Sequence, residues 1–177
     1  ARCRLILKAA DAGGIHIGLH TLSGVNIAEY SPFLSEAVDD YLAAYIDVAV
    51  RLNAEWVVVH PGHHFGDKQL RMEAAVAHIA KAAKYAEDKG ATLYLENMNW
   101  EPDLAEVHYL AHTVEEAQYY FDRLNSPALK WSFTVNHAHL VPDGIDGFID
   151  GLDTSRLGEV RIADFTGDYD VHMKPGK

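Results

Sequence analysis

Short apolar runs alternate with helical segments along the whole chain, and this alternation most constrains the fold. Five runs have the character of strands, and one of them, "WVVVH", is continuously apolar, as expected of a strand buried on both faces. Helix signals separate the runs. The alternation predicts a parallel α/β sheet, either a barrel or a doubly wound fold. The predicted strands span 13–20, 56–60, 91–97, 129–137 and 158–165.

The predicted helices have recognisable beginnings and ends. One spans 35–52, and the next runs from Lys68 to Lys89, where Gly90 can end it as a C-cap. Thr113 begins another with a glutamate at the third position, a capping box, and a short helix follows over 143–152. With 177 residues, 49% hydrophobic and 23% charged, the chain has the make-up of a single domain over 1–177.

Composition and missing motifs argue against nucleotide binding, nucleophilic serine catalysis, a membrane span and nucleic-acid binding. No strand is followed by a Gly-rich phosphate loop, and no Gly-x-Ser-x-Gly elbow is present. No apolar run is long enough to cross a membrane, and no secretory leader is visible. One cysteine permits a reducing compartment, so cytoplasm is the expected location. The net charge of -11 disfavours nucleic acid as a partner.

Polar side chains follow the ends of the predicted strands. In parallel α/β folds these ends open on one face, where reactive groups gather. A single histidine at a strand end is more often a hydrogen-bonded structural residue than a ligand. A repeated series at one face favours a metal site, because imidazole and carboxylate suit zinc, manganese or iron. The series is His20, His60, Glu96, His137, Asp170 and His172.

Five segments together resemble the xylose isomerase-like TIM barrel superfamily. They are "LHTLSG", "VVVHPGHH", "LYLENMNW", "VNHAHLVPDGIDGF" and "VRIADFTGDYDVHMKPGK", and they cover nearly the whole chain in order. The superfamily includes sugar phosphate isomerases and epimerases, and endonuclease IV. The resemblance implies a partial (β/α)8 barrel, roughly strands two to six with their helices. Because a complete barrel takes about 250 residues, either further residues close it or copies associate as a homo-oligomer through the open edges.

The resemblance also implies two sets of metal ligands. Three-metal members match the first set at His20, His60 and Glu96, and the second at His137, Asp170 and His172. The site of single-metal epimerases is not intact. Of its four ligands only Glu96 is retained, since Thr134 and Arg161 stand at two positions and the fourth falls on a strand after Lys177. A guanidinium cannot ligate a cation.

Other residues are candidates for substrate contact. Arg161 can clamp a phosphate or carboxylate, or it can form an ion pair with Asp164 or Glu159. His63 and Asn97 follow strand ends, but loop histidines and asparagines are often only solvated. Asn99 can orient Glu96 or a sugar hydroxyl, and Trp100 can stack on a sugar ring or merely cover the barrel mouth.

Three functions follow from these expectations. The first is a metal-dependent sugar or sugar phosphate isomerase or epimerase, in which the metal favours an enediolate while Glu96, or a carboxylate outside these residues, moves the proton and Arg161 assists. The second is an endonuclease IV-like phosphodiesterase. The third is an inactive relative that binds a carbohydrate.

Overall fold

The computed structural model describes residues 2–167 and 170–176. Five strands form one sheet in the order β1-β2-β4-β6-β7, and every neighbouring pair is parallel. Neighbours in the sheet therefore follow one another along the chain, as in an opened barrel. The fold is a half-barrel of mixed α/β type, which confirms the predicted partial TIM barrel. The strands are β1 (Gly18–His20), β2 (Trp56–Val59), β4 (Leu93–Glu96), β6 (Leu129–Thr134) and β7 (Leu157–Arg161).

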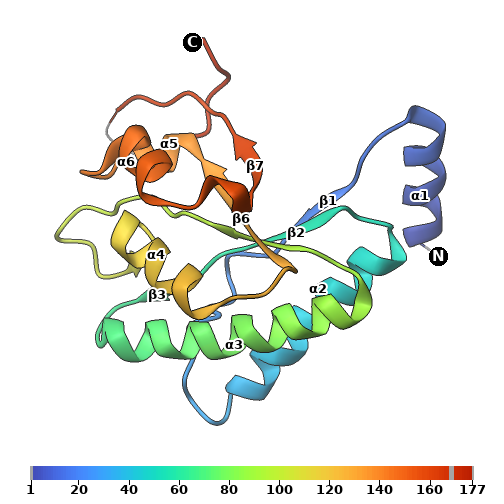
Figure 1. Ribbon diagram of the computed structural model, residues 1–177, viewed down its shortest axis with the longest axis horizontal. Helices are drawn as coiled ribbons and strands as arrows, with labels where there is room; N and C mark the ends of the chain where they lie inside the picture. The colour runs from blue at the N-terminus through green and yellow to red at the C-terminus, as the bar shows by residue number, and fades with distance from the viewer. Residues whose placement is uncertain (1, 168–169, 177) are drawn as a thin grey trace.

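Helices cover one face of this sheet. Figure 1 shows α2 and α3 side by side below the sheet, α4 beside α3, and α5 and α6 next to β6 and β7. The first helix lies apart, beside β1, with Ala10 as its buried residue. The helices are α1 (Arg2–Gly13), α2 (Ser35–Arg51), α3 (Lys68–Lys89), α4 (Val114–Arg123), α5 (Val135–His139) and α6 (Gly144–Gly151), with a 3₁₀ turn at Thr154–Arg156.

Helix ends follow the capping signals in the sequence. Asp67 accepts a hydrogen bond from the Leu70 amide at the start of α3, and Gly90 ends the helix in the left-handed region with φ of 72°. Glycine adopts that conformation without the steric penalty of a Cβ atom. The Thr113 side chain likewise accepts from the Glu116 amide at the start of α4. The predicted bounds of α3 and the predicted cap of α4 are confirmed.

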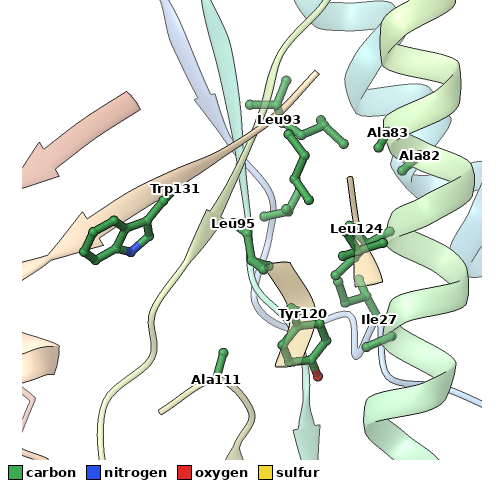
Figure 2. Close-up of a cluster of buried hydrophobic side chains, with 14 of the residues drawn as sticks. Ile27, Ala82, Ala83, Leu93, Leu95, Ala111, Tyr120, Leu124 and Trp131 are labelled. Atoms are coloured by element: carbon green, nitrogen blue, oxygen red, sulfur yellow. The ribbon is translucent and has the colours of Figure 1, made fainter. Parts of the chain in front are cut away.

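The main core lies between the sheet and the helices. Leu93 and Leu95 of β4 point from the central strand toward α3, and Tyr120 of α4 and Ile27 close the same cluster (Figure 2). All four residues of β4 are buried, as expected of a central parallel strand. This packing fixes the strand that carries Glu96.

The other face of the sheet forms a second layer, inside the half-barrel. Trp56 and Tyr94 stack with ring centroids 5.8 Å apart. Glycines flank the two rings: a Cβ at Gly18 would lie 2.4 Å from Trp56, and one at Gly158 would lie 2.5 Å from Tyr94. Since side chains alternate along a strand, the residue two positions after Tyr94 faces the same interior, at the carboxyl end. That residue is Glu96.

Several segments differ from the prediction. Strand β1 covers only Gly18–His20 rather than 13–20, and residue 13 is the last residue of α1. Strand β6 ends at Thr134, and the chain turns directly into α5, so His137 lies on a helix rather than on the strand. Strand β7 ends at Arg161 instead of continuing to residue 165. A small antiparallel pair, β3 (His63–His64) with β5 (His108–Tyr109), was not predicted, because two-residue strands carry no periodic signal.

The edges of the half-barrel expose apolar side chains. On and after the edge strand β7, Val160 is 50% and Ile162 68% exposed. The open edges agree with the expectation of an unclosed barrel. Among the described helices none has the length and apolar character needed to span a membrane.

Candidate metal and substrate pocket

A cavity of about 430 Å³ opens at the carboxyl ends of the parallel strands. Its lining brings together side chains from every strand of the main sheet or from the segment that follows it. All six predicted metal ligands line it, together with Arg161, Asn99 and Trp100. The six are His20, His60, Glu96, His137, Asp170 and His172.

The first predicted ligand set converges on one carboxylate oxygen. The Nε2 atoms of His20 and His60 each lie 3.2 Å from Oε2 of Glu96. One donor atom from each of the three side chains lies within 4.8 Å of the others. Alternate residues of a strand face the same side of the sheet, so His20 shares the inner face with Gly18, and Glu96 shares it with Tyr94.

The chemistry of this set fits a cation. His20 Nδ1 lies 2.7 Å from the Thr21 carbonyl and donates its proton there, so Nε2 is the nitrogen left to bind a metal. His60 Nδ1 is buried and has no hydrogen-bond partner among the described residues. Two imidazole nitrogens facing one carboxylate oxygen concentrate lone pairs. A divalent ion is the group that satisfies all three donors at once.

The second oxygen of Glu96 has different partners. Oε1 accepts a 2.5 Å hydrogen bond from the Thr134 hydroxyl and lies 2.8 Å from Arg161 Nη1. Arg161 thus pairs with Glu96 rather than with Asp164 or Glu159; Glu159 instead accepts a hydrogen bond from Ser132. Arg161 occupies one of the two positions at which the ligand of the single-metal epimerase site is not retained.

Glu96 is 1% exposed yet carries a strongly stabilised negative charge. Burial alone would raise the pKa of its carboxyl. Without a cation, protons on the His20 and His60 nitrogens that face Glu96 provide hydrogen bonds and charges that outweigh burial, so the pKa of the carboxyl lies well below its ordinary value. A bound cation would take the place of those protons. Conversely, the hydrogen bond to Glu96 raises the pKa of His20, against burial.

The second predicted ligand set also converges. His137 Nε2 lies 3.3 Å from Asp170 Oδ2, and His172 Nε2 lies 3.3 Å from Asp170 Oδ1. His137 Nδ1 donates to the Asn97 carbonyl at 2.8 Å, which leaves Nε2 free as a ligand. Asn136 donates to Asp170 at 2.8 Å and orients the carboxylate. His137 reaches the pocket from α5, because that helix begins directly after Thr134.

Two predicted substrate residues lie elsewhere. Asn97 bridges β4 and β6: its amide donates to the Thr134 carbonyl at 3.1 Å, and its oxygen accepts from the Thr134 amide at 2.9 Å. Both polar atoms of the Asn97 side chain are therefore hydrogen-bonded to the backbone, and the side chain does not line the cavity. His63 belongs to β3 and packs edge-on against Tyr109, outside the lining.

The sequence reading missed Glu101. It lines the cavity beside Asn99, whose amide donates to its carboxylate at 2.6 Å. Glu101 directly follows Trp100 in the same loop, and this adjacency was the available signal. Ser23 and Tyr109 also line the cavity and were not singled out.

Comparisons with known proteins agree with this architecture. The chain is 23% identical to a D-tagatose 3-epimerase-like protein, with a TM-score of 0.86 over 99% of this chain and 66% of that one. It is 17% identical to an L-ribulose 3-epimerase, with a TM-score of 0.76 over 94% and 58%. For a D-psicose 3-epimerase from Clostridium cellulolyticum H10 the identity is 20% and the TM-score 0.73, over 89% and 56%.

At these identities the likenesses show the fold, and the chain spans between 56% and 66% of the length of the three structures. Comparison with curated proteins gives no match. The profile of the family "Xylose isomerase-like TIM barrel" matches residues 1–177 in full. The chain therefore belongs to the xylose isomerase-like TIM barrel family.

Proposed function

We propose that this chain forms the core of a metal-dependent sugar epimerase or isomerase that acts on a small carbohydrate. The observation that carries the proposal is the approach of His20 and His60 to a single oxygen of buried Glu96, at 3.2 Å each. The similar structures include sugar 3-epimerases, and this supports the choice of substrate class.

The residues that would hold the cation are His20, His60 and Glu96, with His137, Asp170 and His172 as a second set. The nitrogen and oxygen donors suit zinc, manganese or iron. A divalent ion at such a site supplies Lewis-acid polarisation of a sugar carbonyl and stabilises negative charge that develops on oxygen.

Glu96 is better suited to ligation than to proton transfer. Its lowered pKa makes it a weak base, since efficient proton transfer needs a pKa near the working pH. We assign proton transfer to Glu101. Among the described carboxylates of the cavity, Glu96 and Asp170 face imidazoles, whereas Glu101 contacts the Asn99 amide.

Arg161 and Trp100 would orient the substrate. Nη1 of Arg161 is bound to Glu96, and its partly exposed side chain lines the cavity, so its remaining N–H groups can contact substrate oxygen atoms. Asn99 holds Glu101 and can reach a hydroxyl. A sugar phosphate, whose anionic group suits a guanidinium, is the favoured variant of the substrate.

The experiment is an epimerisation assay on the metal-loaded, full-length protein with D-tagatose, D-psicose and L-ribulose, and with a ketohexose phosphate. We expect Glu101→Gln to lower kcat by about 100-fold or more while bound metal stays unchanged. Asp103→Asn, an exposed carboxylate of the same loop, is the matched control. Absence of turnover on all of these sugars by loaded wild-type protein would refute the proposal.

A second candidate, phosphodiester cleavage, is favoured by one observation: two separate donor sets share one cavity, as two-metal hydrolysis requires. The net charge of -11 opposes binding to a DNA backbone. Incision of an abasic-site duplex at low salt by metal-loaded protein tests it. Thermal stabilisation by a sugar without any turnover would instead indicate the inactive, carbohydrate-binding relative.

A further inference from the structure

A second cavity of about 320 Å³ shares the Trp100 wall with the metal and substrate pocket. It lies between the first turns of α3 and α4. Lys68 enters it from α3, and His112 and Glu116 enter it from the segment that begins α4. None of the six predicted metal ligands lines it, so the proposed catalytic function leaves this cavity unexplained.

Two side chains of this cavity carry buried polar atoms without partners. Glu116 and His112 have side chains that are 7% and 10% exposed. Glu116 Oε1 is held by Lys68 Nζ at 2.8 Å, but Oε2 has no hydrogen-bond partner among the described residues. His112 Nδ1 also has none there. A buried polar atom without a hydrogen bond lowers the stability of the folded protein unless a ligand or ordered water supplies the missing bond.

Both unpartnered atoms are acceptors. Burial lowers the pKa of His112, against the charge of Glu116, so its imidazole carries a single proton near neutral pH. Its Nε2 lies 3.5 Å from Glu116 Oε1, which favours the proton on that nitrogen and leaves Nδ1 as an acceptor. A ligand for this cavity must therefore supply hydrogen-bond donors.

The remaining features select among ligands rich in donors. Among the described residues, two sets of three side chains are close enough to bind one cation, and both lie in the candidate metal and substrate pocket. The second cavity is therefore no preformed metal site. Inside the cavity the Lys68 ammonium and the Glu116 carboxylate form an ion pair and cancel, and Glu115 is exposed to solvent, so the cavity favours a neutral ligand over a cation or an anion. The Trp100 ring, 4.8 Å from that of His112, offers a flat apolar wall.

We propose that this second cavity binds a neutral polyhydroxylated molecule, a free sugar or polyol. Small rotations of the two buried side chains would let its hydroxyl groups donate to Glu116 Oε2 and His112 Nδ1 and accept from Lys68, while its C–H face packs on Trp100. The site is separate from the first pocket and does not depend on the epimerase proposal, although Trp100 connects the two sites physically.

The test is calorimetric titration of EDTA-treated, full-length protein with D-fructose. EDTA removes any cation held in the candidate metal and substrate pocket, and we expect D-fructose binding to persist. Glu116→Gln and Lys68→Met should each raise Kd at least tenfold, whereas Glu87→Gln, an equal charge change on the exposed last turn of α3, should not. D-fructose 6-phosphate should bind more weakly than D-fructose, because the cavity favours a neutral ligand.

Lys68 is half exposed at the first residue of its helix, so Lys68→Met keeps the test decisive if Glu116→Gln fails to fold. Binding that disappears with the metal would place the sugar in the first pocket alone and overturn the proposal. Binding unaffected by either substitution would also overturn it. No binding at all would mean that ordered water alone satisfies the two acceptors. Failure of turnover by metal-loaded protein is a different outcome and bears only on the epimerase proposal.

Discussion

Two clusters in this molecule combine a buried side chain with imidazole and carboxylate groups, yet they are built differently. One surrounds Glu96 in the metal and substrate pocket. The other lies between α2 and α3, where His78 Nδ1 lies 2.5 Å from Asp39 Oδ1 and Nε2 lies 2.9 Å from the Glu29 carbonyl. Lys81 donates to the second oxygen of Asp39 at 2.6 Å.

The difference lies in how donors and acceptors are matched. In the Asp39 cluster, each ring nitrogen of His78 has its own acceptor and each oxygen of Asp39 its own donor. In the Glu96 cluster, two imidazole nitrogens converge on one oxygen, and His60 Nδ1 has no partner among the described residues. The first arrangement is complete by itself. The second needs additional protons, or a bound cation, to bring two imidazole nitrogens against one carboxylate oxygen.

The largest expected contrast is in metal affinity. His60→Ala should weaken zinc binding by roughly 100-fold or more, because it removes a direct ligand and even outer partners are worth about 10- to 100-fold. His78→Ala, the matched change in the complete cluster, should leave zinc affinity unchanged. Competition with a chromophoric chelator measures both. Equal affinities in the two variants would erase the distinction between the clusters.

The contrast should reverse for stability in the absence of metal. His78→Ala leaves Asp39 and the Glu29 carbonyl without their buried partner, and we expect it to lower the free energy of unfolding by about 2 kcal/mol. His60→Ala should change it by less than about 1 kcal/mol, because it also relieves the crowding of lone pairs. Urea unfolding of the EDTA-treated proteins provides the comparison, and a larger loss for His60→Ala would contradict it.

The smallest expected effect concerns acid. Burial opposes ionisation of Asp39, but hydrogen bonds from Lys81 and His78 outweigh it and lower the pKa of its carboxyl below the unfolded value of 3.8. A lowered pKa stabilises the fold above that value, and the stabilisation is lost as pH falls through the folded-state pKa. Because Asp39 is partly exposed, we expect less than about 1 kcal/mol.

Asp39→Asn should remove this part of the acid dependence, so its stability should fall less steeply than that of the wild type below pH 3.8. Urea unfolding of the metal-free proteins across that range measures the slope. Parallel curves for the two proteins would show that Asp39 contributes nothing to it.

Much of the fold could be predicted from local signals. The bounds of α3 follow from its periodicity and from Gly90, and the inward direction of Glu96 follows from the period of two along β4. His137 was placed on a strand, yet it still reaches the predicted partners, because α5 starts directly after Thr134. Local pattern was enough wherever a residue's direction depends on its own element.

The partners of Arg161 and the role of Asn97 could not be predicted in the same way. Arg161 of β7 pairs with Glu96 of β4, with β6 between the two strands, and Asn97 binds the backbone of β6. Both contacts depend on which residues lie opposite one another in neighbouring strands, and the local pattern of one strand does not reveal this pairing. The two-residue strand at His63 and the entry of Glu101 into the cavity depend on loop geometry for the same reason.

We expect Glu96 and its two imidazoles to hold a cation, whereas Asp39 joins α2 to α3 through His78 and Lys81. Elemental analysis of full-length wild type, Glu96→Gln and Asp39→Asn, purified without chelator, tests it most directly. We expect at least one equivalent of zinc, manganese or iron per chain in wild type and Asp39→Asn, and a loss of metal in Glu96→Gln. Equal metal content in all three proteins, or none in wild type, would contradict it.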